Sequence, residues 1–74
     1  MNYYYSVVHS YFNNIEFISH HENYDEAINK LIQLFDEYSK TFKTKVINEC
    51  KFLIINDGKI VTDIYEIVLT PYSK

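Results

Sequence analysis

The spacing of apolar residues predicts strands in the first quarter of the chain. Residues 3–12 are mostly aromatic or β-branched, and a second apolar run occupies residues 15–18. Asn13 and Asn14 separate the two runs, and asparagine tolerates the left-handed backbone that tight turns require. A two-residue turn at Asn13-Asn14 would therefore join the runs as a first β-hairpin.

The spacing then changes to the period of a helix. Apolar residues recur three and four positions apart between residues 24 and 42. Asn23, followed three residues later by Glu26, is typical of a helix N-cap with a reciprocal capping side chain, and Asp25 adds negative charge to the first turn. We therefore expect a helix from Tyr24 to about Phe42, about 28 Å long at 1.5 Å per residue. Lysines at its far end would complement the helix dipole: Lys40, Lys43 and Lys45.

The last third of the chain predicts a second hairpin. Two β-branched runs at residues 46–55 and 60–69 enclose Asp57-Gly58, a strong short-range hairpin signal, and Pro71 ends the second run. In this reading Cys50 lies in the middle of a strand and behaves as a small core residue.

Two registers are open for this second hairpin. A two-residue turn places Glu49 opposite Glu66, which is unfavourable. A three-residue loop with Gly58 in the left-handed region places Lys51 opposite Asp63, and this charge pairing favours the second register.

These elements predict an α+β fold of order ββαββ, formed as one domain over residues 1–74. Two β-hairpins flank one amphipathic helix, and a four-stranded, mostly antiparallel sheet carries the helix on one face. Both faces of the hairpins are apolar, whereas one helix covers only one face. The residues expected on an uncovered face, and hence at an interface, are Tyr3, Tyr5, Leu53, Ile55, Val61, Tyr65, Ile67 and Leu69.

Length and composition limit the function classes. A chain of 74 residues builds a small core, and its single cysteine cannot form an internal disulfide, which leaves association with another chain as a source of stability. A net charge of −3 and the absence of arginine disfavour nucleic acid as a partner. No apolar run is long enough for a membrane span and no signal peptide is recognisable, so we expect a cytoplasmic location without membrane binding.

Candidate catalytic and metal-binding residues have simpler structural explanations. His9 and His20 would lie on one face of the first hairpin near Glu16, but zinc requires three or four ligands. Cys50 in an apolar strand is a poor nucleophile. A single glycine excludes the common phosphate-binding loops. We therefore expect no enzyme activity, no metal and no cofactor.

The leading functional hypothesis is a small non-enzymatic protein-binding module that acts through its uncovered apolar and aromatic face. The partner would be a target protein or a second copy in a homodimer. By compositional analogy, such a protein could be a phage or mobile-element inhibitor of a host defence enzyme, similar in role to an anti-CRISPR protein. The alternative is a single-stranded nucleic-acid or nucleotide binder that stacks bases on its eight tyrosines.

Overall fold

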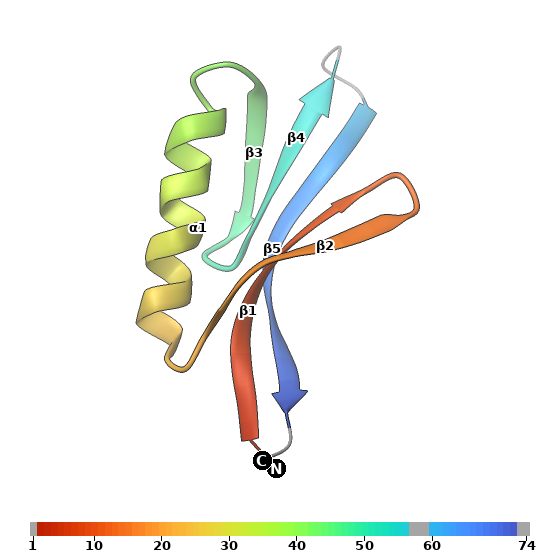
Figure 1. Ribbon diagram of the computed structural model, residues 1–74. Helices are drawn as coiled ribbons and strands as arrows, with labels where there is room; N and C mark the ends of the chain where they lie inside the picture. Colours follow the sequence, from red (N-terminus) through yellow and green to blue (C-terminus); the bar gives the residue numbers. More distant parts are fainter. Residues whose placement is uncertain (1, 57–59, 73–74) are drawn as a thin grey trace.

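A computed structural model describes residues 2–56 and 60–72 of the chain. Figure 1 shows the elements in the order β1 (Asn2–Tyr11), β2 (Asn14–His21), α1 (Tyr24–Tyr38), β3 (Lys43–Asn48), β4 (Lys51–Asn56) and β5 (Ile60–Tyr72). The strands form one antiparallel sheet in the order β2-β1-β5-β4-β3. The predicted α+β class, with hairpins before and after one helix on the sheet, is confirmed. The sheet has five strands instead of the expected four.

The helix begins where the sequence predicts and ends earlier. Asn23 Oδ1 accepts a hydrogen bond from the Glu26 backbone N–H at 2.9 Å, so the predicted N-cap is confirmed. The last helical residue is Tyr38, and the backbone N–H of Phe42 bonds back to the Tyr38 carbonyl at 2.8 Å in the turn that follows. Serine and threonine at positions 39, 41 and 44 are weak helix formers, and they favour this early end.

The extra strand comes from a turn that the apolar pattern concealed. Glu49 and Cys50 connect β3 to β4, and Asn48 Oδ1 accepts a hydrogen bond from the Cys50 backbone N–H at 2.8 Å. Asparagine commonly makes such a bond to the backbone two residues further on. The placement of Cys50 in the middle of a strand was wrong. The lysines expected at the end of the helix are also displaced, because Lys43 and Lys45 belong to β3.

The register of β4 and β5 corrects both alternatives considered for this hairpin. Lys51 pairs with Glu66, not Asp63, and their charged groups are 3.9 Å apart. The pairing shifts by one residue beside Ile54, which leaves Thr62 as the extra residue of a β-bulge. A one-residue shift moves side chains to the opposite face of a sheet, so the predicted faces of this hairpin change as well. The left-handed conformation expected for Gly58 lies outside the described residues.

The turn of the first hairpin lies one residue earlier than predicted. Tyr11 pairs with Asn14, so the two loop residues are Phe12 and Asn13 rather than Asn13 and Asn14. Phe12 has φ of 52°, in the left-handed region that a two-residue hairpin turn usually reserves for glycine or asparagine.

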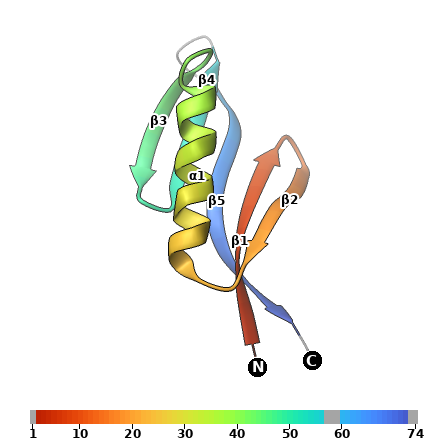
Figure 2. The same ribbon diagram turned by 60° about the vertical axis from the view of Figure 1, so that its left-hand side comes forward.

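The core lies between α1 and one face of the sheet. Figure 2 shows α1 on one face of the sheet, with its axis roughly parallel to β5. Tyr65 is at its centre: it is 4% exposed, and its ring lies 4.4 Å from His9, 5.0 Å from Phe52 and 5.2 Å from Tyr38. This one side chain therefore contacts β1, β4 and the helix. The other members of the buried cluster are Val7, Ala27, Leu31, Leu34 and Ile54.

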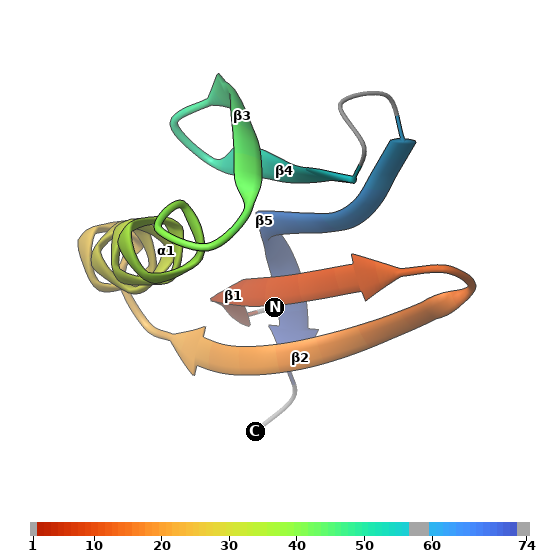
Figure 3. The same cartoon turned by 90° about the horizontal axis from the view of Figure 1, so that it is seen from above.

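The sheet curves around the helix. Figure 3, seen from above, shows it bending from β3 through β5 to β2, with α1 on the concave side. On the opposite face, Ser6 and Val8 of β1 are also buried, although the helix does not cover them. None of the helical residues described here forms a segment long and apolar enough to cross a membrane.

The core predicts a sharp contrast between neighbouring helix residues. Leu31 is buried, whereas Ile32 is 52% exposed. Leu31→Ala should lower the free energy of unfolding by about 2–4 kcal/mol because it leaves a cavity, and Ile32→Ala by less than about 1 kcal/mol. Urea denaturation measures both. Equal losses would contradict the assigned helix face.

Candidate functional site

Three polar clusters involve residues that could take part in chemistry. In the first, His9 Nε2 lies 2.7 Å from Asp63 Oδ1, and Thr62 Oγ1 donates to the other carboxylate oxygen at 3.0 Å. The His9 ring stacks on Tyr65 and lies at a tilt beside Tyr11. The contact between His9 and Asp63 thereby joins β1 to β5. These contacts fix the pairing of the two strands and are a structural explanation for this histidine.

The second cluster joins the start of the helix to the β3–β4 turn. Tyr24 Oη donates to Glu49 Oε1 at 2.8 Å and lies 2.8 Å from Cys50 Sγ. The hydrogen bond with Cys50, followed by the one with Glu49, raises the pKa of Tyr24 above its usual value. The cluster connects α1 to the sheet through side-chain hydrogen bonds.

The third cluster lies on the face of the sheet opposite the helix. Ser6 Oγ lies 2.6 Å from His20 Nδ1. The ring centroids of His20 and Phe17 are 5.4 Å apart, those of His20 and Tyr4 5.5 Å, and those of Tyr4 and Tyr72 4.0 Å. We call Tyr72, Tyr4, His20 and Phe17 the outer aromatic row. It covers Ser6 and explains how the second face of the sheet buries a serine.

The histidines do not converge as the sequence suggested. His9 lies on the helix side of β1, whereas His20 pairs with Ser6 on the opposite face, because a bulge between Val7 and Val8 changes the register of the hairpin. Among residues 2–56 and 60–72, no group of three or more His, Cys, Asp or Glu side chains is arranged to hold a metal ion.

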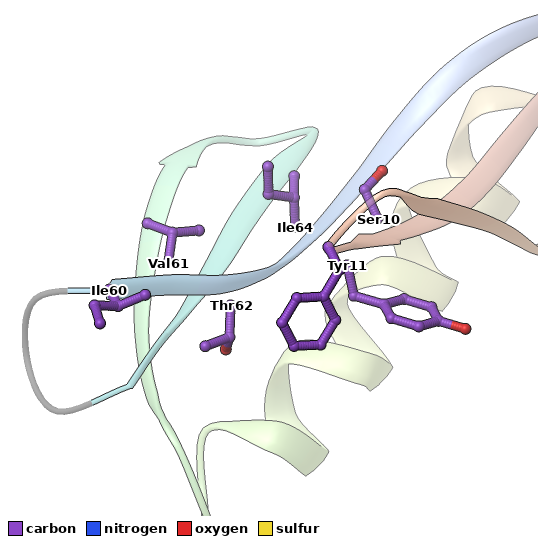
Figure 4. Close-up of a pocket in the computed structure, with 7 residues that line it drawn as sticks. Ser10, Tyr11, Ile60, Val61, Thr62 and Ile64 are labelled. Carbon is purple, nitrogen blue, oxygen red and sulfur yellow. The ribbon is translucent and has the colours of Figure 1, made fainter.

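A hollow in the surface lies at the open ends of the two hairpins. The tip of β1–β2 and the start of β5 diverge, and between them lies a notch of about 280 Å³ (Figure 4). Its described lining residues are all uncharged: Ser10, Tyr11, Phe12, Ile60, Val61, Thr62 and Ile64. Phe12 is 92% exposed and Ile60 61% exposed at its rim. Ile15 and Phe17 of β2 continue the exposed apolar surface, and we call Phe12, Ile15 and Phe17 the hairpin tip.

A second groove, of about 350 Å³, separates α1 from β3. Ile28, Ile32 and Phe35 line one side of it and Val46 the other. Here β3 is an edge strand, and it carries Lys43 and Lys45 and a bulge after Val46. Charged residues and bulges are features that prevent an edge strand from pairing with another chain. We therefore regard the notch as the stronger candidate site.

The residues predicted for an interface do not form one surface. Tyr65 is a core residue and lies on the helix side, and Tyr5 and Ile67 pack against the same core. Tyr3 and Leu69 are exposed together near the chain ends, where Tyr5 pairs with Leu69. Leu53 and Ile55 are half-buried. Only Val61 lines the notch.

The sequence interpretation missed the hairpin tip, although one signal was present. Phe12 directly precedes the asparagines that predict the turn, and a turn one residue earlier places the Phe12 side chain in solvent. Exposed apolar residues at the ends of strands can be identified only when the register between the paired strands is known.

Comparisons of this chain with protein-family models, with curated proteins and with solved structures found no match. The geometry of the chain itself therefore carries the functional argument.

Tyr65 predicts how stability depends on alkaline pH. Burial, together with the hydrogen bond to Tyr38, raises its pKa above the usual value near 10. The neutral phenol is favoured in the folded state, so its contribution is complete below pH 10 and is lost as the pH rises above 10. For Tyr65→Phe, the unfolding free energy should fall less steeply above pH 10, by up to about 1.4 kcal/mol per pH unit. Parallel curves for both proteins in alkaline urea titrations would argue against a buried phenol.

Proposed function

We propose that this protein is a non-enzymatic protein-binding module that uses the hairpin tip and the notch as its contact surface. The observation that carries the proposal is the conformation of Phe12. A bulky residue in the left-handed region costs about 1–2 kcal/mol, and here the side chain recovers little of that cost through burial because it is 92% exposed. Strain of this kind is typical of positions that serve binding rather than stability.

The surroundings of Phe12 support a protein partner. Exposed aromatic and aliphatic side chains around a hollow whose described lining is uncharged resemble the centre of a protein interface, where charged residues are depleted. Strand alternation directs Glu16 to the opposite face from Ile15 and Phe17, so its carboxylate does not interrupt the surface.

The position of the surface supports the same conclusion. Figures 1, 2 and 3 place the hairpin tip on the side of the molecule away from α1. The helix cannot cover it, and the described chain offers no other helix to do so. A partner is the remaining means of removing these side chains from water.

The biological setting stays a prediction from composition. We expect a cytoplasmic protein, and the hypothesis of a phage or mobile-element inhibitor of a host defence enzyme would give the surface a target. Such an inhibitor acts by occupying its target and needs no catalytic residue of its own.

Replacing Phe12 by Asn should separate stability from binding. Asparagine tolerates the left-handed region, so Phe12→Asn should raise the free energy of unfolding by about 1 kcal/mol in urea denaturation. Proteins that the wild-type chain captures from extracts of its source cell should be lost with this variant.

Phe42→Asn is the matched control, because Phe42 is a half-exposed phenylalanine outside the hairpin tip. This variant should retain the captured proteins. The proposal fails if both variants capture the same proteins as the wild type.

A second candidate, single-stranded nucleic acid, is favoured by the distribution of charge. Strand alternation places Lys43, Lys45 and Lys51 on the face opposite the helix, with Glu66 among them. This is also the face of the outer aromatic row. Carboxylates on the exposed surface of α1 account for much of the negative charge: Asp25, Glu26, Asp36 and Glu37. Lysines beside aromatic rings on a sheet are a known means of binding unpaired bases.

Fluorescence anisotropy with labelled oligonucleotides separates the two candidates. The nucleic-acid candidate predicts binding at about 50 mM salt that weakens as salt rises and is reduced by Lys45→Glu, but less by Lys40→Glu, which makes the same charge change outside the sheet. The protein-binding proposal predicts no binding at about 50 mM salt.

A further inference from the structure

We infer that the partner of the hairpin tip is a second copy of this chain, with Phe12 of each copy seated in the notch of the other. The inference rests on the proposed function and names its partner. It starts from the fact that the exposed Phe12 side chain borders a hollow whose described lining is uncharged.

The shapes of the two parts match. The notch has a volume of about 280 Å³, which is enough for one phenyl ring with its methylene group. Phe12 lies at the rim of its own notch and is 92% exposed, so its ring is free to enter another. Ile60 and Val61 would then cover the inserted ring.

The symmetry of the contact is closed. Because Phe12 and the notch are neighbours, a two-fold axis beside the hairpin tip lets one pair of chains make both insertions at once. Two-fold dimers are the commonest oligomers, and the same surface then serves on both chains. A pairing that closes in this way does not continue into fibres.

The charge distribution permits two copies to approach at this end. The chain has a net charge of −3, but the described lining of the notch is uncharged. The acidic residues of α1 lie on the far side of the molecule from the hairpin tip (Figure 1). The insertion therefore brings no charged side chain of the described lining of one copy against the other.

The area available predicts a weak, reversible dimer. Five large apolar side chains surround the site: Phe12, Ile15, Phe17, Ile60 and Val61. Together they offer on the order of 500 Å² per chain, so the dimer would bury about 1,000 Å² in total, at the low end of specific interfaces. Interfaces at this low end of the size range are typical of weak, transient complexes.

Sedimentation equilibrium between about 1 and 500 µM tests the inference. The wild-type mass should rise from one chain to two across this range. Phe12→Asn removes the inserted ring, and Val61→Asp places a charge against it, so each variant should weaken dimerisation at least tenfold. Phe42→Asn should dimerise within threefold of the wild type, and circular dichroism confirms that all four proteins are folded.

A mixture provides the more specific test. Phe12→Asn keeps the six other described lining residues of the notch, and Val61→Asp keeps Phe12, so the two variants together retain one of the two insertions. Labelled Phe12→Asn should therefore form a heterodimer with unlabelled Val61→Asp more tightly than either variant pairs with itself. A mixture no tighter than the separate variants would overturn the reciprocal insertion.

The outcomes distinguish this inference from the proposed function. A wild-type chain that stays monomeric at 500 µM, while Phe12→Asn still loses captured proteins, overturns the dimer and leaves a target-binding module. A dimer that survives Phe12→Asn unchanged overturns the inference by placing the contact elsewhere. A monomer whose captured proteins do not depend on Phe12 overturns both.

Discussion

The length of the helix is the constraint on which the rest of the structure depends. Its 15 residues span about 22 Å, whereas the 13 residues of β5 span about 43 Å. The longest dimension of the molecule, 44 Å, is close to the length of that strand. The helix therefore covers only the middle of the sheet, where Tyr65 joins two neighbouring strands to Tyr38. Apolar side chains beyond its reach stay exposed at both ends, as Leu69 does near the chain ends and Phe12 at the hairpin tip.

The outer aromatic row reduces the apolar surface on the second face of the sheet. One helix leaves that face uncovered. Here His20 of the row contacts buried Ser6, and Phe17 of the row pairs with buried Val8. The surplus of apolar surface inferred from the sequence is therefore real, but it is concentrated at strand ends instead of spread over a face. Our proposal places the binding surface at one of these strand ends, the hairpin tip.

Local signals predicted the elements well and their pairing poorly. Asn23 and Glu26 identify the start of the helix because capping involves residues three positions apart. The registers depend on bulges at Ile18 and Thr62, which lie within hairpins of consecutive strands and have no local sequence signature. Tyr65 illustrates the result: the shift beside Thr62 moves it from a supposed interface to the centre of the core. Phe12 illustrates the reverse, since a turn displaced by one residue exposes it.

The structure thus combines a conventional core with a strained, exposed aromatic residue that the core does not need. Stability alone favours asparagine or glycine at position 12, and our proposal is that a contact made by the Phe12 ring offsets the strain. Intermolecular nuclear Overhauser effects in a mixture of isotope-labelled and unlabelled chains test this contact most directly. The Phe12 ring of one chain should show them to the methyl groups of Val61 and Ile64 of another. A dimer without these effects, or with effects confined to α1 and β3, would contradict the role assigned to the hairpin tip.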